Sequence, residues 1–383
     1  MKHSYIAKRF QSSAAGLSLD TEALAKYKDI IDLSIGDTDF TTDESIINAA
    51  FRDAKAGHTH YGDPKGDPEL IDAVCRAWEE DFGQRLPRDH VLVSASSCLG
   101  MALVMLAILD PGDEVIVFSP YFPMYREQIE LAGGVCVDVP TYASEDYAID
   151  EARLHAAITP RTKAIVFNNP TNPTGMGYDG KTLELLARVA QEHDLLIAAD
   201  EIYTTYLYEG DFRPIRTLPG MAERTITLNS FSKNFLMTGW RVGVIIAEPE
   251  LLAVMNRING SLIYSAPSIS QRAAIQALAM RKEIREKYVT AYRDRIFYAA
   301  DRIEKLPYLS LVRPKGTFYL FPGVEKTGLD EKAFCKVLLD QAHVLVSPGT
   351  PFGVSAAGHF RIACTVGIDQ LKTAFDRMEK LSF

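Results

Sequence analysis

The stretch TITLNSFSKNFLMTGWRVGVIIA, residues 225–247, contains two apolar runs with a polar segment between them. The runs are TITL (225–228) and VGVIIA (242–247), and polar or turn-forming residues follow each at once. Uninterrupted apolar strands are typical of a sheet that is covered on both faces, and such sheets are usually parallel. The stretch therefore indicates two strands of a buried sheet, with Lys233 in the segment that joins them.

Further apolar runs of strand length occur upstream. They are VIVF (115–118), AIVF (164–167) and LLIAA (195–199), and polar or turn residues flank them. Helical patterns lie between the runs, most clearly in KTLELLARVAQEHD (181–194), where four apolar residues share one stripe: Leu183, Leu186, Ala187 and Ala190. Strands that alternate with helices are typical of parallel sheets. The sequence therefore predicts an α/β fold with a mostly parallel sheet.

The chain has 383 residues, which is too long for one ordinary hydrophobic core. We predict a large domain over residues 45–285 and a smaller α+β domain built from both chain ends, residues 1–44 and 286–383. The C-terminal part begins with a long helical pattern, MRKEIREKYVTAYRDRIFYAADRIEKL, and then offers two strand candidates: GTFYLF (316–321) and FRIACTV (360–366).

The composition is that of an ordinary globular protein, with 47% apolar and 24% charged residues. The formal net charge of −9 argues against nucleic acid or an anionic membrane as a partner. The longest apolar run, MALVMLAIL (101–109), is too short to span a bilayer. The N-terminal sequence MKHSYIAKRFQSSAAG lacks the apolar segment of a signal peptide. We expect a cytoplasmic protein that binds neither nucleic acid nor membranes.

The cysteine and histidine residues predict neither disulfides nor a metal site. The five cysteines are widely spaced and form no CxxC pair, which is typical of free thiols in a reducing compartment: Cys75, Cys98, Cys136, Cys335 and Cys364. His58 and His60 are close in sequence, but no third metal ligand accompanies them. We therefore expect solvated loop histidines and no metal ion.

Polar side chains gather where the predicted strands end. They are Ser119, Asn168 to Asn172, Asp200 and Ser230 to Lys233. In open α/β sheets, ligands bind beyond the carboxyl ends of the strands, so we expect a site at this edge. Lys233 stands among Phe231, Phe235 and Leu236. Such surroundings weaken the preference of an amine for its charged form and favour nucleophilic chemistry.

A series of spaced motifs resembles one enzyme family over almost the whole chain. Ser230-Phe-Ser232-Lys233, followed by Gly239-Trp240-Arg241-Val-Gly243, is similar to the cofactor-lysine signature of the class I/II aminotransferases. These are pyridoxal-phosphate (PLP) enzymes of fold type I, the aspartate aminotransferase fold, whose large domain has a seven-stranded sheet covered by helices. Other family motifs occur in the same order: LSIGDTDF (33–40), YGDPKGDPEL (61–70), DPGDEVIVFSPYF (110–122), NPTNPTG (169–175), DEIY (200–203), GTFYLF (316–321) and FRIA (360–363).

The resemblance implies roles for the residues around the cofactor ring. Lys233 would form the Schiff base with PLP and then move the Cα proton of the substrate. Asp200 would pair with the pyridine nitrogen and keep it protonated. Tyr203 and Asn172 would hydrogen-bond the phenolic oxygen of the ring. Phe122 aligns with the aromatic residue that stacks on the ring, which is more often Trp or Tyr in the family.

The resemblance also implies where the cofactor phosphate binds. Ser96, Ser97 and Cys98 open a predicted helix, whose first N–H groups and positive end attract anions. The other implied phosphate ligands are Ser230, Ser232 and Arg241, and a guanidinium suits phosphate because it offers two parallel donors.

Substrate and subunit contacts follow from the same resemblance. Arg361 would bind the α-carboxylate of the substrate, with Asn172 close by, and the backbone of Gly36 would pass near it. Tyr61 corresponds to the tyrosine that reaches the phosphate of the neighbouring subunit. The resemblance therefore implies a homodimer with shared active sites.

The implied activity is that of an aminotransferase, which moves an amino group between an amino acid and a 2-oxo acid. The alternative is a PLP-dependent carbon–sulfur β-lyase of the cystathionine or cysteine-conjugate type, and the motifs around PLP do not separate the two. A regulatory protein on the same fold is disfavoured, because Lys233, Asp200 and Arg361 are all present. The amino donor and acceptor stay open, since no second cation can be assigned to a substrate side chain.

Overall fold

The computed structural model describes residues 5, 7 and 26–383. The prediction about a signal peptide concerns residues 1–16. Except for Tyr5 and Ala7, these residues lie outside the described part of the chain. Within them, no helix is both long enough and apolar enough to cross a membrane. The five cysteines have free thiols, as the sequence predicts.

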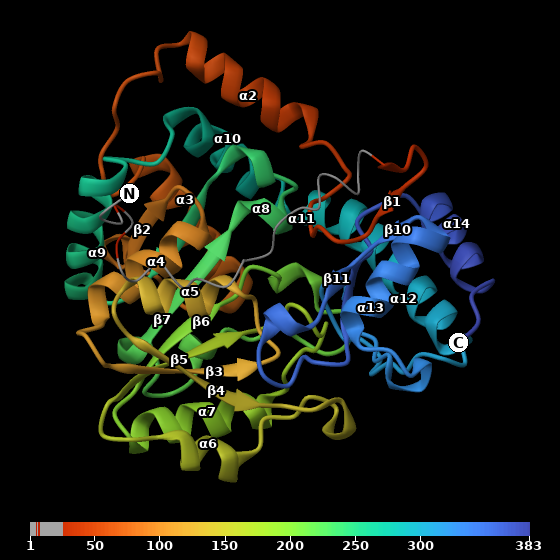
Figure 1. The fold of residues 1–383 in the computed structure, drawn as a ribbon. Helices are drawn as coiled ribbons and strands as arrows, with labels where there is room; N and C mark the ends of the chain where they lie inside the picture. Colours follow the sequence, from red (N-terminus) through yellow and green to blue (C-terminus); the bar gives the residue numbers. More distant parts are fainter. Residues whose placement is uncertain (1–4, 6, 8–25) are drawn as a thin grey trace.

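The large sheet has seven strands in the order β2-β8-β7-β6-β5-β3-β4 (Figure 1). Their bounds are β2 Val91–Ser94, β3 Glu114–Ser119, β4 Val135–Pro140, β5 Thr162–Asn168, β6 Leu196–Asp200, β7 Thr225–Ser230 and β8 Gly243–Ile246. Neighbouring strands from β4 to β7 pair in parallel, whereas β8 pairs antiparallel with both β7 and β2. The prediction of a mostly parallel, seven-stranded sheet is confirmed. The reversed β8 places Glu248 at the opposite edge from Asp200, where it pairs with Arg216.

Both faces of this sheet are buried, which explains the uninterrupted apolar runs. In β5, Ala164 and Val166 pack on the side of α4, α5 and α9, while Ile165 and Phe167 pack on the side of α6 and α7. The covering helices, together with the group that packs around β2 and β8, are α2 Glu44–Lys55, α3 Pro68–Phe82, α4 Ser97–Ile108, α5 Met124–Leu131, α6 Glu151–Ala157, α7 Gly180–Glu192, α9 Pro249–Leu262 and α10 Ser268–Ala279. The predicted stripe of α7 is buried.

A smaller α+β unit lies beside the sheet and contains both ends of the described chain. Its strands are β1 Ile31–Asp32, β9 Tyr319–Leu320, β10 Val344–Leu345, β11 Ser347–Pro348 and β12 Phe360–Ala363. β1 pairs with β10, and the order β11-β12-β9 forms an antiparallel sheet. Ile31 and Leu33 share a core with helices α12, α13 and α14. The exact division at residues 44/45 and 285/286 stays a prediction.

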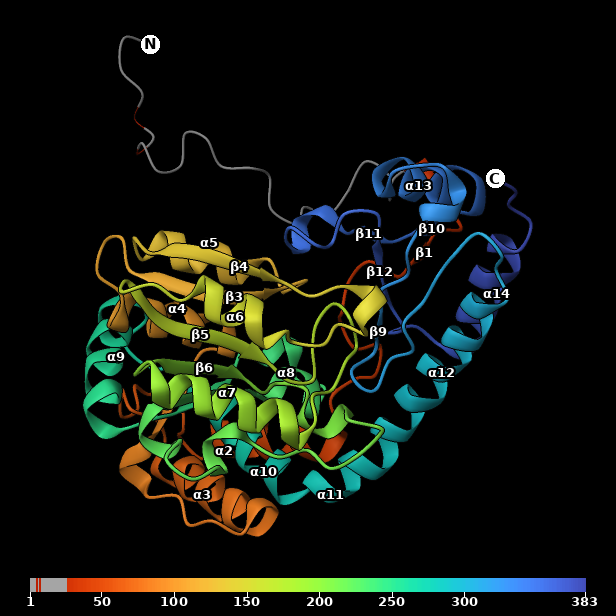
Figure 2. The same cartoon turned by 90° about the horizontal axis from the view of Figure 1, so that it is seen from below.

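The long helical pattern after residue 280 is interrupted in the structure. It consists of α11 Arg281–Ile284, a π-helical turn over Arg285–Val289 and α12 Thr290–Glu304. Figure 2 shows α12 running from α11, beside the large sheet, towards α14 in the smaller unit. The remaining helices are α8 Phe231–Asn234, α13 Glu331–Val337 and α14 Ile368–Met378. α12 thus spans the two parts of the molecule.

Candidate active site

A cavity of about 790 Å³ opens at the carboxyl ends of the parallel strands and extends to the smaller unit. Thirteen of the predicted site residues line it: Gly36, Ser96, Ser97, Cys98, Phe122, Asn172, Asp200, Tyr203, Ser230, Ser232, Lys233, Arg241 and Arg361. They come from segments far apart in the sequence. The parallel strands bring several of them together, because the last residues of these strands lie at the same edge of the sheet. The fourteenth, Tyr61, lies elsewhere.

Lys233 lies in the short helix α8, directly after β7. Ser230 begins this helix, and its hydroxyl accepts a hydrogen bond from the N–H of Ser232 at 3.0 Å. The Lys233 Nζ donates to the carbonyl oxygen of Gly36. Loss of solvent around the amine lowers the pKa of Lys233 to about 8, although the Asp37 carboxylate acts in the opposite direction. A large fraction of this amine can therefore be uncharged at mildly alkaline pH.

Asp200 ends strand β6, and its side chain is buried. The Tyr125 hydroxyl donates to its Oδ2 atom, whereas Oδ1 has no hydrogen-bond partner among the residues that the structure describes. Burial raises the pKa of Asp200 to about 6, and the hydrogen bond from Tyr125 counteracts this effect. A buried oxygen without a partner costs free energy, so this atom is suited to a cationic or N–H group of a ligand.

Arg361 on β12 is buried between two aromatic rings. Its guanidinium carbon lies 4.6 Å from the ring centre of Tyr319 and 4.9 Å from that of Phe352. Nη1 donates to Asn172 Oδ1 at 3.0 Å, and Nη2 donates to the carbonyl oxygen of Ser34 at 2.7 Å. The Nε atom has no partner within the described part of the chain. The cavity thus contains a rigidly held cation that is suited to a carboxylate.

The start of helix α4 forms another wall of the cavity. Ser96 precedes the helix with a φ of 132°, and its hydroxyl accepts from the N–H of Leu99 at 3.1 Å. β8 approaches this turn so closely that a Cβ on Gly243 would lie 2.7 Å from the backbone nitrogen of Ser97. Glycine is therefore required there. The first N–H groups of α4 carry partial positive charge, so this wall is suited to an anion.

Arg241 follows Lys233 in the sequence after one short loop, and both residues line the cavity. Its Nη1 atom donates to the carbonyl oxygen of Thr238 at 2.7 Å and contacts the Ser232 hydroxyl at 3.5 Å. Together with the start of α4, this guanidinium provides a second region that attracts anions.

Sequence reasoning missed several residues of the cavity. The hydroxyls of Tyr319 and Tyr203 are hydrogen-bonded at 3.2 Å, and the Tyr125 hydroxyl donates to the Asp200 carboxylate. Both lie within or beside motifs quoted for the family, but nothing in the linear pattern indicates which ring points inward. Lys332 and Lys336 of α13 also line the cavity, although the sequence offered no second cation for a substrate side chain. Lys336 pairs with Asp340 at 2.6 Å.

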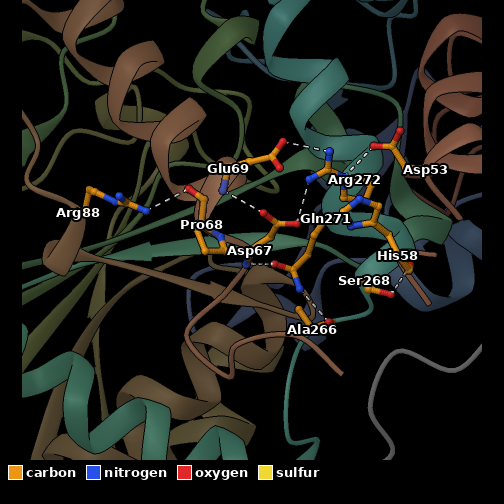
Figure 3. Close-up of polar contacts among 10 residues, drawn as sticks. All are labelled: Asp53, His58, Asp67, Pro68, Glu69, Arg88, Ala266, Ser268, Gln271 and Arg272. Carbon is orange, nitrogen blue, oxygen red and sulfur yellow. Dashed lines mark hydrogen bonds and ion pairs between the residues drawn. The ribbon is translucent and has the colours of Figure 1, made fainter. Parts of the chain in front are cut away.

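Tyr61 is the predicted site residue that the structure does not bring to the cavity. Its side chain is 85% exposed, and its ring contacts that of Tyr264 with the centres 4.9 Å apart. It lies in the loop between α2 and α3. Figure 3 shows how the ends of this loop are held by Arg272 of α10, which pairs with Asp53, Asp67 and Glu69 at 2.7, 3.2 and 3.0 Å.

The mostly parallel sheet, the lysine at the ends of its strands and two regions suited to anions meet at one cavity, an arrangement that is typical of α/β enzymes. The family is settled by comparison with known proteins. Residues 28–378 match the family described as aminotransferase class I and II, so the chain belongs to this family and is an aminotransferase.

Two curated relatives and one solved structure are similar over nearly the full chain. The arginine–pyruvate transaminase AruH of Pseudomonas aeruginosa is 35% identical, covering 99% of this chain and 97% of that protein. The aspartate/prephenate aminotransferase of Thermus thermophilus is 38% identical, covering 92% and 91%. A structure of Thermus thermophilus aspartate aminotransferase, double mutant 1, has a TM-score of 0.93 at 35% identity, covering 99% and 100%. These names support the aminotransferase prediction, and none of them is a carbon–sulfur lyase.

Proposed function

We propose that the cavity binds pyridoxal phosphate between Lys233 and Asp200. The observation that carries this proposal is the buried Oδ1 atom of Asp200, which has no partner among the described residues and lies in the same cavity as the Lys233 amine. A protonated pyridine nitrogen would satisfy that oxygen and keep the carboxylate ionised. The residues present therefore fit this cofactor.

When bound, PLP withdraws electrons from the substrate and makes its Cα proton acidic. Lys233 holds the cofactor covalently in the resting enzyme and moves the Cα proton during turnover. Its pKa of about 8 suits this work, because an acid–base catalyst acts best when its pKa lies near the working pH. Asp200 holds the positive charge on the ring nitrogen.

The remaining predicted residues bind the other edges of the cofactor. Asn172 and Tyr203 donate to the phenolic oxygen, and Phe122 covers one face of the ring. The phosphate lies at the start of α4, where its ligands are Ser96, Ser97, Cys98, Ser230, Ser232 and Arg241. The helix start, with its Ser96 turn, and the Arg241 guanidinium support this assignment.

Arg361 binds the α-carboxylate of the amino acid and of the 2-oxo acid, beside Gly36 and Asn172. The tight packing of its guanidinium between two rings supports this role, since little side-chain entropy is lost when a carboxylate binds. The named relatives act on arginine with pyruvate and on aspartate or prephenate, so family membership leaves the substrate side chain open.

We further propose that the enzyme is a homodimer with shared active sites, in which Tyr61 reaches the cofactor phosphate of the partner. The exposure of Tyr61 supports this assignment, since it leaves the hydroxyl free to contact another subunit. We also propose that residues 45–285 form the large domain and that residues 1–44 and 286–383 form the smaller one. The proposed location is the cytoplasm.

Visible absorbance of the bound cofactor tests the function directly. Single amino acids are added to the purified enzyme, and conversion to the amine form with release of the matching 2-oxo acid is expected for the true donor. Release of pyruvate and ammonia from cystathionine, with no amine transfer to any 2-oxo acid, would instead identify a lyase.

Lys233→Ala is expected to bind PLP without a covalent link and to lose turnover by at least about 100-fold. Borohydride reduction followed by peptide mass spectrometry measures the link. Lys315→Ala, at a lysine outside the cavity lining, is the control. Full activity in Lys233→Ala would remove Lys233 from its role.

A further inference from the structure

Residues 33–42 extend from the smaller unit to the segment that follows Lys233 and helix α8. At one end, Leu33 pairs through its backbone with Leu345 and Ala363, at 2.8 Å in each case. At the other end, the Thr42 hydroxyl donates to the carbonyl oxygen of Leu236 at 2.6 Å and accepts from Trp240 Nε1 at 3.0 Å. We call residues 36–42 the strap.

The strap packs directly against the lysine. The carbonyl oxygen of Gly36 accepts from Lys233 Nζ, and a Cβ on Gly36 would lie 1.7 Å from the Tyr319 hydroxyl. A side chain at position 36 therefore has no room beside Tyr319. The strap covers part of the Lys233 amine, which also lines the cavity.

An ion pair holds the middle of the strap. Arg295 of α12 donates to both oxygens of Asp39, from Nη1 at 2.7 Å and from Nη2 at 3.0 Å. The Tyr292 hydroxyl donates to Asp39 Oδ1 at 3.0 Å, and the Arg295 guanidinium lies 4.7 Å from the ring centre of Phe40. Arg295 is 8% exposed. The Asp39 side chain is 29% exposed, so the pair is buried on the arginine side only, and its two-pronged geometry orients both partners.

Through Tyr292, the ion pair is connected to aromatic side chains near Lys233. The ring of Tyr292 lies 5.3 Å from that of Phe318, and Lys233 Nζ lies 5.9 Å from the Phe318 ring centre. Tyr206, whose ring is 5.8 Å from Tyr292, donates its hydroxyl to the carbonyl oxygen of Lys233 at 2.9 Å.

We propose that Asp39 and Arg295 are positioning residues for Lys233, because their ion pair holds the strap and keeps the Gly36 carbonyl against the amine. The inference rests on the proposed role of Lys233. It adds two residues that do not line the cavity, and it assigns to α12 a part in the chemistry as well as in the fold.

The largest influence on the amine gives the direction of the expected change. The charged groups that face Lys233 are Asp37 of the strap, Arg361 of β12 and Arg241, but burial is the largest influence and lowers the pKa of the amine. A strap that has lost its ion pair admits water to Lys233. The pKa of Lys233 then rises towards its ordinary value, because solvent favours the charged amine.

The test measures the pH dependence of Lys233 modification by trinitrobenzenesulfonate in the full-length, cofactor-free protein, with the labelled peptide quantified by mass spectrometry. Asp39→Asn keeps the side-chain size and removes the charge. Its midpoint is expected about half a pH unit or more above that of the wild type. Arg302→Gln is the matched control, since Arg302 lies on the same helix and pairs with Asp376 and Glu379 at 2.7 and 2.8 Å, within the smaller unit.

Arg295→Lys retains the charge but cannot form the two-pronged contact, and it tests the inference if Asp39→Asn does not fold. Its labelling midpoint is also expected to rise, by less than that of Asp39→Asn. Profiles of both folded variants that overlay those of the wild type and Arg302→Gln would overturn the inference. The labelling needs no cofactor, so this failure is distinct from full activity in Lys233→Ala, which would refute the proposed function instead.

Discussion

At the scale of single residues, the environment of Asp200 shows how a neighbour tunes a buried carboxyl group. Burial alone would favour the protonated acid, and the hydroxyl of Tyr125 favours the carboxylate by donating to Oδ2. Together with a backbone hydrogen bond from Ile202, which also favours the carboxylate, these effects leave the pKa at about 6. Tyr125 therefore helps to keep the carboxylate charge on which the proposed PLP site depends.

Tyr125→Phe is expected to raise the pKa of Asp200 further, since a donor to the charged form is lost. Below that raised pKa the carboxyl is protonated, so PLP affinity of the cofactor-free protein should fall by about tenfold near pH 6.5 and stay close to wild type near pH 9. Titration of cofactor absorbance at each pH measures this. Tyr178→Phe, at a partly buried tyrosine outside the large cavity, serves as control. Equal loss at both pH values would argue for a packing defect.

At the scale of secondary-structure elements, Arg272 joins three helices. It extends from α10 to Asp53 of α2 and to Asp67 and Glu69 at the start of α3. Its side chain is 10% exposed. Because Asp53 and Asp67 are also mostly buried, loss of the arginine would leave Asp67 without this ion pair and Asp53 with only the exposed Arg52 at 3.5 Å.

Arg272→Ala is expected to lower the free energy of unfolding by about 2 kcal/mol or more. Arg281→Ala is the comparison, because Arg281 also bridges to α3 but its partners Glu80 and Asp81 are 57% and 42% exposed. It should cost about 1 kcal/mol or less. Urea unfolding of both variants measures the difference, and equal losses would show that burial of the carboxylates does not decide the cost.

At the scale of the whole molecule, the proposed sharing of sites predicts complementation between inactive subunits. In a mixed dimer of Lys233→Ala and Tyr61→Ala, the site of the Tyr61→Ala subunit keeps its own lysine and receives tyrosine from its partner. Random mixing of equal amounts gives half mixed dimers, so about a quarter of wild-type activity should return.

The measurement is turnover after the two purified variants have been unfolded and refolded together, with each variant refolded alone as control. Activity equal to the mean of the separate variants would contradict the sharing of Tyr61 across the interface, while leaving the assignments within one subunit unaffected.

Part of the cavity lining was readable from the linear sequence, because Asn172, Asp200, Ser230, Ser232 and Lys233 end or follow buried strands. Apolar runs mark the strands, and parallel strands deliver their last residues to one edge, so Asp200 and Lys233 had to lie near each other. Arg361 came only from the family resemblance, since nothing in its local pattern indicates a pocket. β2 and β4 were not recognised, and the direction of β8 was not readable from its apolar run.

Local sequence thus determined the buried strands of this protein, the amphipathic helices between them and the lysine at the sheet edge, because these depend on short-range periodicity and backbone preferences. The tertiary structure decided the side-chain directions. Only the packed chain brings Tyr125 to Asp200, Tyr319 to Tyr203 and Asp39 to Arg295, which are 75, 116 and 256 residues apart. Such pairs arise from the geometry of packing between distant segments, and no periodicity along the chain encodes them.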